Sequence, residues 1–299
     1  MRELVKGYIA AFISAVTYGM IPLFMIPIKQ EGFSVDVALF YRFIISAVCL
    51  GGYLIYKKES LRFSLREGLL FVVLGILYAL SAEFLFIAYD LLTPGIASTI
   101  FFMYPLIVAL GLALFFGERL TASTLLALVM VLIGVFFLSV KDIHSLSINY
   151  LGAFVSLLGA LVYALYMLIV QKGKLSASGI KVSFYSTLFS AVYFVVKVYI
   201  TGHTLVIPDA YTSLLLTGFS LITTLLSLVT LVYAIWQIGS TPTSIIGVME
   251  PLVAVAISIW VYHQEELTYN LIIGVVLIAI AVVIDIYQRS ASRTGVNNE

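Results

Sequence analysis

Three ionisable side chains interrupt long apolar runs of the sequence, and they are the first candidates for chemistry. Arg42, Glu83 and Glu250 each stand about 9–12 Å from one end of such a run, taking 1.5 Å per residue of helix. An ionised group in hydrocarbon is costly, so residues of this kind are rare there and commonly hold an ion, a proton or a charged substrate group. We therefore treat all three as candidate parts of a transport site.

Arg42 and Glu83 are expected at similar depths on neighbouring helices, where they could form an ion pair. Each lies on a helix face of small residues, which is typical of a face that contacts other helices rather than lipid. Buried charges are usually paired, so one interpretation is a structural ion pair. The other is a site that binds a charged substrate group or a proton, and the two interpretations are compatible.

Glu250 differs from these two because no basic residue of the second half of the chain is expected at its depth. One interpretation is a protonated carboxyl group that hydrogen-bonds a neighbour. The other is a carboxyl group that exchanges a proton or holds a cation as the protein works. Lys197 lies near the end of its apolar run, and we expect its ammonium group to extend toward the lipid headgroups.

Two prolines mark a block of sequence that occurs twice. Met-Tyr-Pro-Leu contains Tyr104 and Pro105, Met-Glu-Pro-Leu contains Pro251, and each block continues with an apolar run, a glutamate (Glu118 or Glu265) and Leu-Thr. Proline interrupts helical hydrogen bonding, and the freed carbonyl is tolerated in a membrane only where protein or a cavity satisfies it. The matched prolines therefore predict either a kink or an opened helix at the binding region. The two glutamates are expected to cap the next helix or to orient the turn.

Tyr18, Tyr104 and Tyr163 could present hydroxyl groups and ring faces to a ligand in a central cavity. Tyr18 and Tyr163 are equivalent in the two halves of the chain. The sequence has 19 tyrosines and 20 phenylalanines, so the alternative interpretation is that these rings fill the core or form the interfacial aromatic belt.

The composition is that of a membrane protein. Hydrophobic residues make up 62% of the chain and charged residues 10%, against about 45–50% and about 25% in soluble domains. The net charge of +1 and the absence of a basic cluster give no reason to expect nucleic acid as a partner. The single cysteine excludes an internal disulfide and a cysteine-based zinc site. We find no nucleotide-binding motif, metal-binding motif or catalytic set, so no cofactor, metal or enzymatic activity is expected.

Ten apolar runs predict an all-α integral membrane protein with ten transmembrane helices and short connections. They lie near 7–28, 34–56, 67–89, 94–116, 122–140, 150–171, 180–200, 211–235, 241–262 and 268–287. The repeated block divides the chain into residues 1–145 and 146–299, with five runs in each half. Because five is odd, the second half must be inverted in the membrane, an arrangement that recurs in secondary transporters.

Small residues with a spacing of four also repeat between the halves. They are Gly7, Ala11, Ala15 and Gly19 in the first run, and Gly152, Ser156, Ala160 and Ala164 in the sixth. Such a stripe either allows close helix packing or faces the substrate.

The chain resembles the EamA-type transporters of the drug/metabolite transporter superfamily. The resemblance rests on the two Pro-Leu blocks, on Arg42 in the second run and on Glu250-Pro251 in the ninth, within a frame of ten spans. It implies a carrier whose central cavity opens alternately to either side of the membrane, and it covers both halves of the chain.

The leading interpretation is therefore a secondary transporter of small metabolites, with export of amino acids or related compounds favoured. A drug or cation efflux carrier is the alternative within this class, with Glu83 or Glu250 holding the cation. A non-transporting multi-pass receptor or assembly protein also stays open. The expected partners are a small-molecule substrate and the lipid bilayer, while coupled protons and a homodimer are left open.

Lysine and arginine predict the orientation in the cell membrane. Twelve of them fall on the side of the N-terminus and two, Lys29 and Lys141, on the other side. Cytoplasmic loops carry the excess of these residues, so both termini are expected to be cytoplasmic.

Overall fold

The computed structural model describes residues 2–92, 94–118, 120–139, 149–205, 207–263 and 268–296. These ranges contain helices and no strand. The expected boundary between the halves, at residues 145 and 146, and Glu265 lie outside the described residues. The helices are α1 (Arg2–Gly19), α2 (Ile21–Gln30), α3 (Val35–Tyr56), α4 (Leu65–Leu91), α5 (Pro94–Phe101), α6 (Tyr104–Phe116), α7 (Ala122–Ser139), α8 (Tyr150–Lys172), α9 (Gly179–Ile200), α10 (Ala210–Ser220), a π-helical segment (Leu221–Leu226), α11 (Ser227–Ile238), α12 (Ser240–Gly247), α13 (Met249–Trp260) and α14 (Tyr269–Val296).

Eight of the ten predicted spans coincide with helical stretches that are long and apolar enough to cross a membrane. The other two, near 122–140 and 268–287, coincide with shorter apolar helical stretches, Ala122–Leu138 and Tyr269–Asp285. The chain is thus a multi-pass membrane protein, and the count of ten spans stays a prediction.

Polar residues start the long helices where the backbone enters the bundle. Ser34, Ser64, Asn149, Ser178 and Asp209 each accept a hydrogen bond from a backbone N–H of the first turn of α3, α4, α8, α9 and α10, respectively. The first N–H groups of a helix have no partner within it, and such side chains satisfy them. The caps fix the register of each helix against its neighbours.

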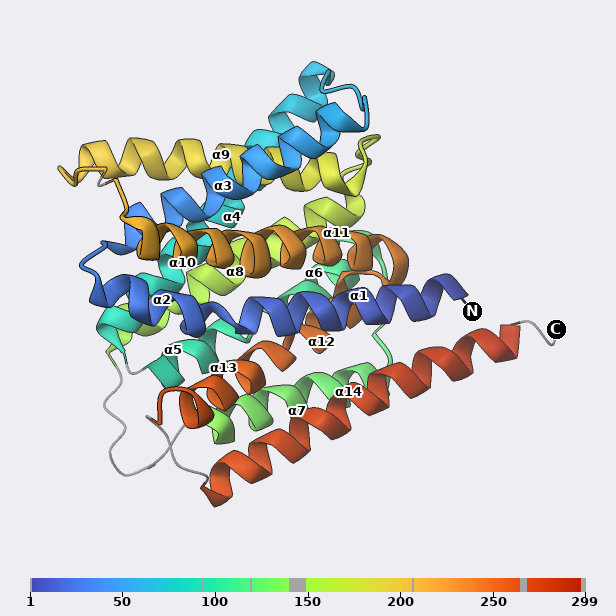
Figure 1. Cartoon of the computed structure of the whole chain (residues 1–299). Coiled ribbons are helices and arrows are strands. Elements are labelled where there is room, and N and C mark those ends of the chain that lie inside the picture. Colours follow the sequence, from blue (N-terminus) through green and yellow to red (C-terminus); the bar gives the residue numbers. More distant parts are fainter. Residues whose placement is uncertain are drawn as a thin grey trace.

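The two halves pack around an approximate two-fold axis. The most extensive contacts join α3 with α9, α7 with α14, α4 with α8, and α1 with α11. The pairs α3–α9 and α7–α14 each join equivalent spans of the two halves. Rotation about the two-fold axis converts the α4–α8 pair into the α11–α1 pair. The ribbon of α3 and that of its counterpart α9 run in opposite directions in Figure 1, as an inverted repeat requires, and both marked termini lie at the same end of the bundle.

Two serines fasten α3 and α9 to the opposite half in equivalent ways. Ser46 Oγ donates to the carbonyl of Ser220 at 2.9 Å, and Ser190 Oγ donates to the carbonyl of Gly75 at 2.8 Å. Interhelical hydrogen bonds of this kind hold helices together where lipid gives no hydrophobic driving force. Ser46 and Ser190 are 144 residues apart, and the same separation relates other equivalent positions on α3 and α9.

The small-residue stripes lie at helix contacts. A methyl group added at Gly7 would meet Ile238 of α11, and one added at Gly152 would meet Leu91 of α4. Ala11 and Ala160 are almost fully buried. The stripes thus let α1 and α8 approach their partners closely.

Candidate functional site

Three predicted spans are broken in the middle, and the breaks meet. The first span breaks at Met20 between α1 and α2, the fourth between α5 and α6, and the ninth at Val248 between α12 and α13. Gly19 lies against the backbone of Glu250, so that a methyl group there would overlap the carbonyl oxygen. Discontinuous helices at mid-membrane are where transporters of this architecture place substrate and ion sites.

The two prolines stand at these breaks, as predicted. Pro105 is in the first turn of α6 and Pro251 in the first turn of α13, both buried. Proline is tolerated at the start of a helix because its missing N–H would have no intrahelical partner there. The sequence signal therefore marks the ends of half-helices rather than kinks within continuous ones.

Tyr104 of the fourth span fits into the break of the ninth. The N–H of Val248 donates a hydrogen bond to the carbonyl of Ile245 at 3.3 Å. The hydroxyl of Tyr104 donates a long hydrogen bond of 3.5 Å to the carbonyl of Ser244. Gly247 leaves the space for this ring, because a methyl group there would overlap the tyrosine hydroxyl oxygen. The break of one half is thus closed by a side chain of the other.

Arg42 is buried with 1% of its surface exposed. Its Nε donates to Thr224 Oγ1 and its Nη2 to the carbonyl of Thr223 at 3.2 Å, both in the π-helical segment of the eighth span. The guanidinium carbon lies 5.2 Å from the ring centre of Tyr18 and 4.9 Å from that of Phe219. Among the described residues Arg42 forms no ion pair, so the expected pair with Glu83 is wrong.

Glu250 lies in the same region with 8% of its surface exposed. The cation that acts on its carboxyl group electrostatically is Arg42, which belongs to the other half of the chain. The hydroxyls of Tyr18, Tyr104 and Tyr163 are within the electrostatic influence of Glu250. The site therefore brings together one buried cation and one buried carboxyl group, among three of the predicted tyrosines.

Buried aromatic rings pack close to these two groups. Tyr163 meets Tyr104 edge-on with ring centres 4.8 Å apart, and it stacks on Phe101 at 5.9 Å. On the other side, Tyr78 packs against Phe43 at 5.6 Å, and the Arg42 guanidinium carbon is 5.5 Å from the same Phe43 ring. Rings arranged in this way can stack on the apolar part of a ligand and bind a cationic group over their faces.

Glu83 belongs to a separate cluster at the far end of the bundle from the termini. Its carboxylate lies 2.9 Å from Lys197 Nζ and accepts a hydrogen bond from the Tyr193 hydroxyl, while Lys197 also pairs with Asp36 at 2.7 Å. The expectation that Lys197 extends to the headgroups is therefore wrong. Its side chain is 22% exposed and holds two carboxylates from α3 and α4 onto α9.

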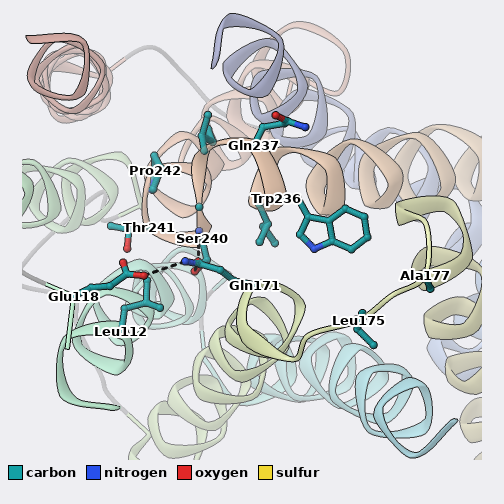
Figure 2. Close-up of a pocket in the computed structure, with 13 residues that line it drawn as sticks. Leu112, Glu118, Gln171, Leu175, Ala177, Trp236, Gln237, Ser240, Thr241 and Pro242 are labelled. Carbon is teal, nitrogen blue, oxygen red and sulfur yellow. Dashed lines mark hydrogen bonds between the residues drawn. The ribbon is translucent and has the colours of Figure 1, made fainter. Parts of the chain in front are cut away.

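A cavity of about 600 Å³ opens between the ends of α6, α8 and α11 and the start of α12. Figure 2 shows Gln171 at its wall, between Glu118 and Ser240. The Gln171 amide donates to Glu118 Oε1 at 3.2 Å and accepts from the Ser240 N–H at 2.7 Å, and Lys172 Nζ lies 2.7 Å from Glu118. Thr121, rather than Glu118, caps α7. Glu118 thus joins the fourth span to the sixth at the mouth of the cavity.

The sequence analysis missed several residues of the site. Thr223 and Thr224, which bind Arg42, lie in a mid-span run that also contains Ser220 and Ser227. The signal was four hydroxyl residues within eight positions at the middle of the predicted span. Tyr78 could not be distinguished from the many other tyrosines.

Replacing Gly247 by alanine should force the Tyr104 hydroxyl out of the break and lower the melting temperature of the protein in detergent. Tyr104→Phe removes the atom that the new methyl group would overlap. We therefore expect the double variant Gly247→Ala/Tyr104→Phe to melt above Gly247→Ala alone, as coupled neighbours do. Additive losses would show that Tyr104 does not occupy this space.

Lys197→Met should destabilise the protein by about 3 kcal/mol, because it leaves two largely buried carboxylates, 14% and 12% exposed, without their cation. Glu83→Gln should cost less, since the pair between Lys197 and Asp36 remains. Unfolding in detergent monitored by circular dichroism measures both, and a double variant Lys197→Met/Glu83→Gln should recover part of the loss. Equal losses for the two single variants would contradict this arrangement.

Comparison with known proteins agrees with this architecture. A family model of EamA-like transporters matches residues 5–140 and again residues 150–286. A solved structure described only as the crystal structure of a protein has a TM-score of 0.78, with 16% sequence identity over 93% of this chain and 96% of that chain, which shows a shared fold. No curated protein matches the chain significantly. Because the two family matches span nearly the whole chain, it belongs to the EamA-like transporter family.

Proposed function

We propose that this protein is a secondary carrier that exports amino acids or related amphipathic metabolites from the cytoplasm by alternating access. The observation that carries the proposal is Arg42, a fully buried cation at the meeting point of the broken spans, with no ion pair among the described residues.

Arg42 is suited to bind the carboxylate of such a substrate. A guanidinium has five N–H donors, and the two hydrogen bonds to the π-helical segment use two of them. Its fork geometry matches a carboxylate, and a buried charge without a counter-ion is costly. A substrate carboxylate would relieve that cost, while the rings of Tyr18, Tyr78 and Tyr163 would contact the rest of the molecule.

Glu250 is suited to couple transport to protons. It stands at the break of the ninth span, in the first turn of α13, and Tyr104 occupies the equivalent position in the first half. A carboxyl group that is accessible first from one side of the membrane and then from the other can take up and release a proton in each transport cycle.

Alternating access needs one side of the protein closed while the other is open. The cavity beside Gln171 lies at the end of the bundle where the termini are, which is the side expected to be cytoplasmic. At the opposite end, Lys197 joins α9 to α3 and α4, and the Tyr262 hydroxyl donates to the Leu23 carbonyl at 2.8 Å. The conformation described is thus suited to load substrate from the cytoplasm.

Arg42→Gln should weaken the binding of ligands that carry a carboxylate. We expect phenylalanine and 3-phenylpropionate to lose about 10–100-fold in affinity for the purified variant, since hydrogen bonds to charged groups contribute about 1.5–3 kcal/mol. Phenethylamine, which lacks the carboxylate, should bind the variant as it binds the parent. Titration calorimetry measures all three ligands.

An unchanged affinity for phenylalanine in Arg42→Gln would sink the proposal. Loss of phenethylamine binding in Glu250→Gln instead, with Arg42→Gln unaffected, would favour the alternative of a cation efflux carrier. That alternative has its own support, because Glu250 lies among tyrosine rings that could hold a cation.

Glu250→Gln should fold normally and lose transport driven by a pH gradient, because the amide cannot titrate. Exchange of substrate without a gradient should be largely retained. Proteoliposomes loaded with labelled amino acid measure both, with Glu31→Gln, at an exposed carboxyl group, as the control that keeps gradient-driven transport. If Glu250→Gln concentrates substrate like the parent, Glu250 is structural.

A further inference from the structure

Two buried hydroxyl groups beside the site have no hydrogen-bond partner in the part of the chain that the structure describes. They are the phenol of Tyr166 on α8 and the Oγ of Ser186 on α9, and both residues have 0% of their surface exposed. The two hydroxyls lie near enough to influence each other, although neither makes a well-formed hydrogen bond. Even a bond between them would leave one of the two protons without an acceptor.

Ser186 is distinct from the other buried serine and threonine residues of α9, which is described over its whole length. Ser183, Thr187 and Ser190 each donate to a carbonyl in the preceding turn of the helix, at 2.9, 2.9 and 2.8 Å. Such back-bonding is the usual way a hydroxyl is satisfied inside a helix. The Ser186 hydroxyl does not use it and is free for another acceptor.

Ser186 occupies the position equivalent to Arg42 in the inverted half. The separation of 144 residues between Ser46 and Ser190 relates Arg42 to Ser186, one helical turn earlier on each helix. Ser46 Oγ also contacts the carbonyl of Arg42 at 2.8 Å, as Ser190 Oγ contacts that of Ser186. The two-fold axis therefore relates a cation on α3 to a neutral hydroxyl on α9.

The ring of Tyr166 lies between the rings that lead to Arg42 and the rings that lead to Tyr104. It stacks parallel to Tyr163 with ring centres 6.4 Å apart, and it packs against Tyr78 at 5.3 Å. Tyr163 leads to Tyr104, and Tyr78 leads through Phe43 to Arg42. The rings of Phe43 and Tyr78 thus separate Tyr166 from the buried cation.

We propose that Tyr166 and Ser186 form a second polar subsite, which binds an acceptor oxygen on the side group of the transported molecule while its carboxylate is at Arg42. The subsite rests on the proposed function and deepens it, since it makes the carrier selective for amino acids with a polar, uncharged side group. Buried unpartnered hydroxyls are uncommon in proteins, and leaving one without a partner destabilises the protein. A ligand that supplies the acceptor recovers that cost.

Glutamine and norleucine test the subsite, because they are similar in length and differ in the carboxamide. Counterflow of each is measured in proteoliposomes for the parent, Tyr166→Phe and Ser186→Ala. Each variant should lower the ratio of glutamine to norleucine transport about 2–10-fold, the effect of one neutral hydrogen bond. Ser183→Ala, which removes a back-bonded hydroxyl from the same helix, should leave the ratio unchanged.

The melting temperature of the empty protein provides a second readout. Tyr166→Phe should melt at or above the parent, because the hydroxyl that it loses is unpartnered without ligand, and glutamine should stabilise the variant less than the parent. An unchanged transport ratio overturns the subsite and assigns the hydroxyls to a fixed water molecule or to each other. A parent that carries norleucine but not glutamine overturns it as well, whereas a parent that carries no amino acid overturns the proposed function with it.

Discussion

The cost of a positive charge in hydrocarbon is the constraint on which the rest of this structure depends. Arg42 is held without an ion pair among the described residues, so its stabilisation comes from carbonyl and hydroxyl oxygens and from aromatic faces. The oxygens belong to an irregular helix, because Thr223 and Thr224 lie in the π-helical segment. The buried charge and the irregular segment of the eighth span are therefore linked by direct hydrogen bonds.

A symmetric scaffold carries an asymmetric site. The serines Ser46 and Ser190 hold the two halves together in equivalent ways. At the positions that face the centre, however, the halves differ, with Arg42 opposite Ser186 and Tyr104 opposite Glu250. An inverted repeat gives two conformations of similar energy, because exchanging the shapes of the halves opens the other side. On the proposed function, the differences at the centre would let one half recognise one group of the substrate and leave the other half free to contribute different chemistry.

The architecture was predictable from the sequence because it depends on patterns that a membrane enforces. Apolar runs of spanning length, the duplicated proline block and the small-residue stripes indicated the spans, the repeat and the close helix contacts. Pairing within the site was not predictable, because depth along a helix does not determine which neighbour lies alongside. Arg42 and Glu83 were matched in depth, yet α9 stands beside α4 and supplies Lys197 to Glu83. The partners of Arg42 come from a π-helical turn that rotates Thr223 and Thr224 inward, and hydropathy carries no signal of that turn.

The ion pairs of Lys197 with Asp36 and Glu83 explain how the two ends of the protein can differ in this conformation. Lys197 joins three helices through charges at one end, whereas at the cavity end Gln171 joins Glu118 to Ser240, and the ion pair between Glu118 and Lys172 is more exposed to solvent. A glutamine bridge separates more easily than an ion cluster with little exposure, because each of its bonds can be replaced by water as the cavity fills. The fourth and ninth spans end at this bridge, and both are broken at the site. Movement of their half-helices would therefore open the bridge and shift the groups around Glu250 together, which is the mechanical link that alternating access requires.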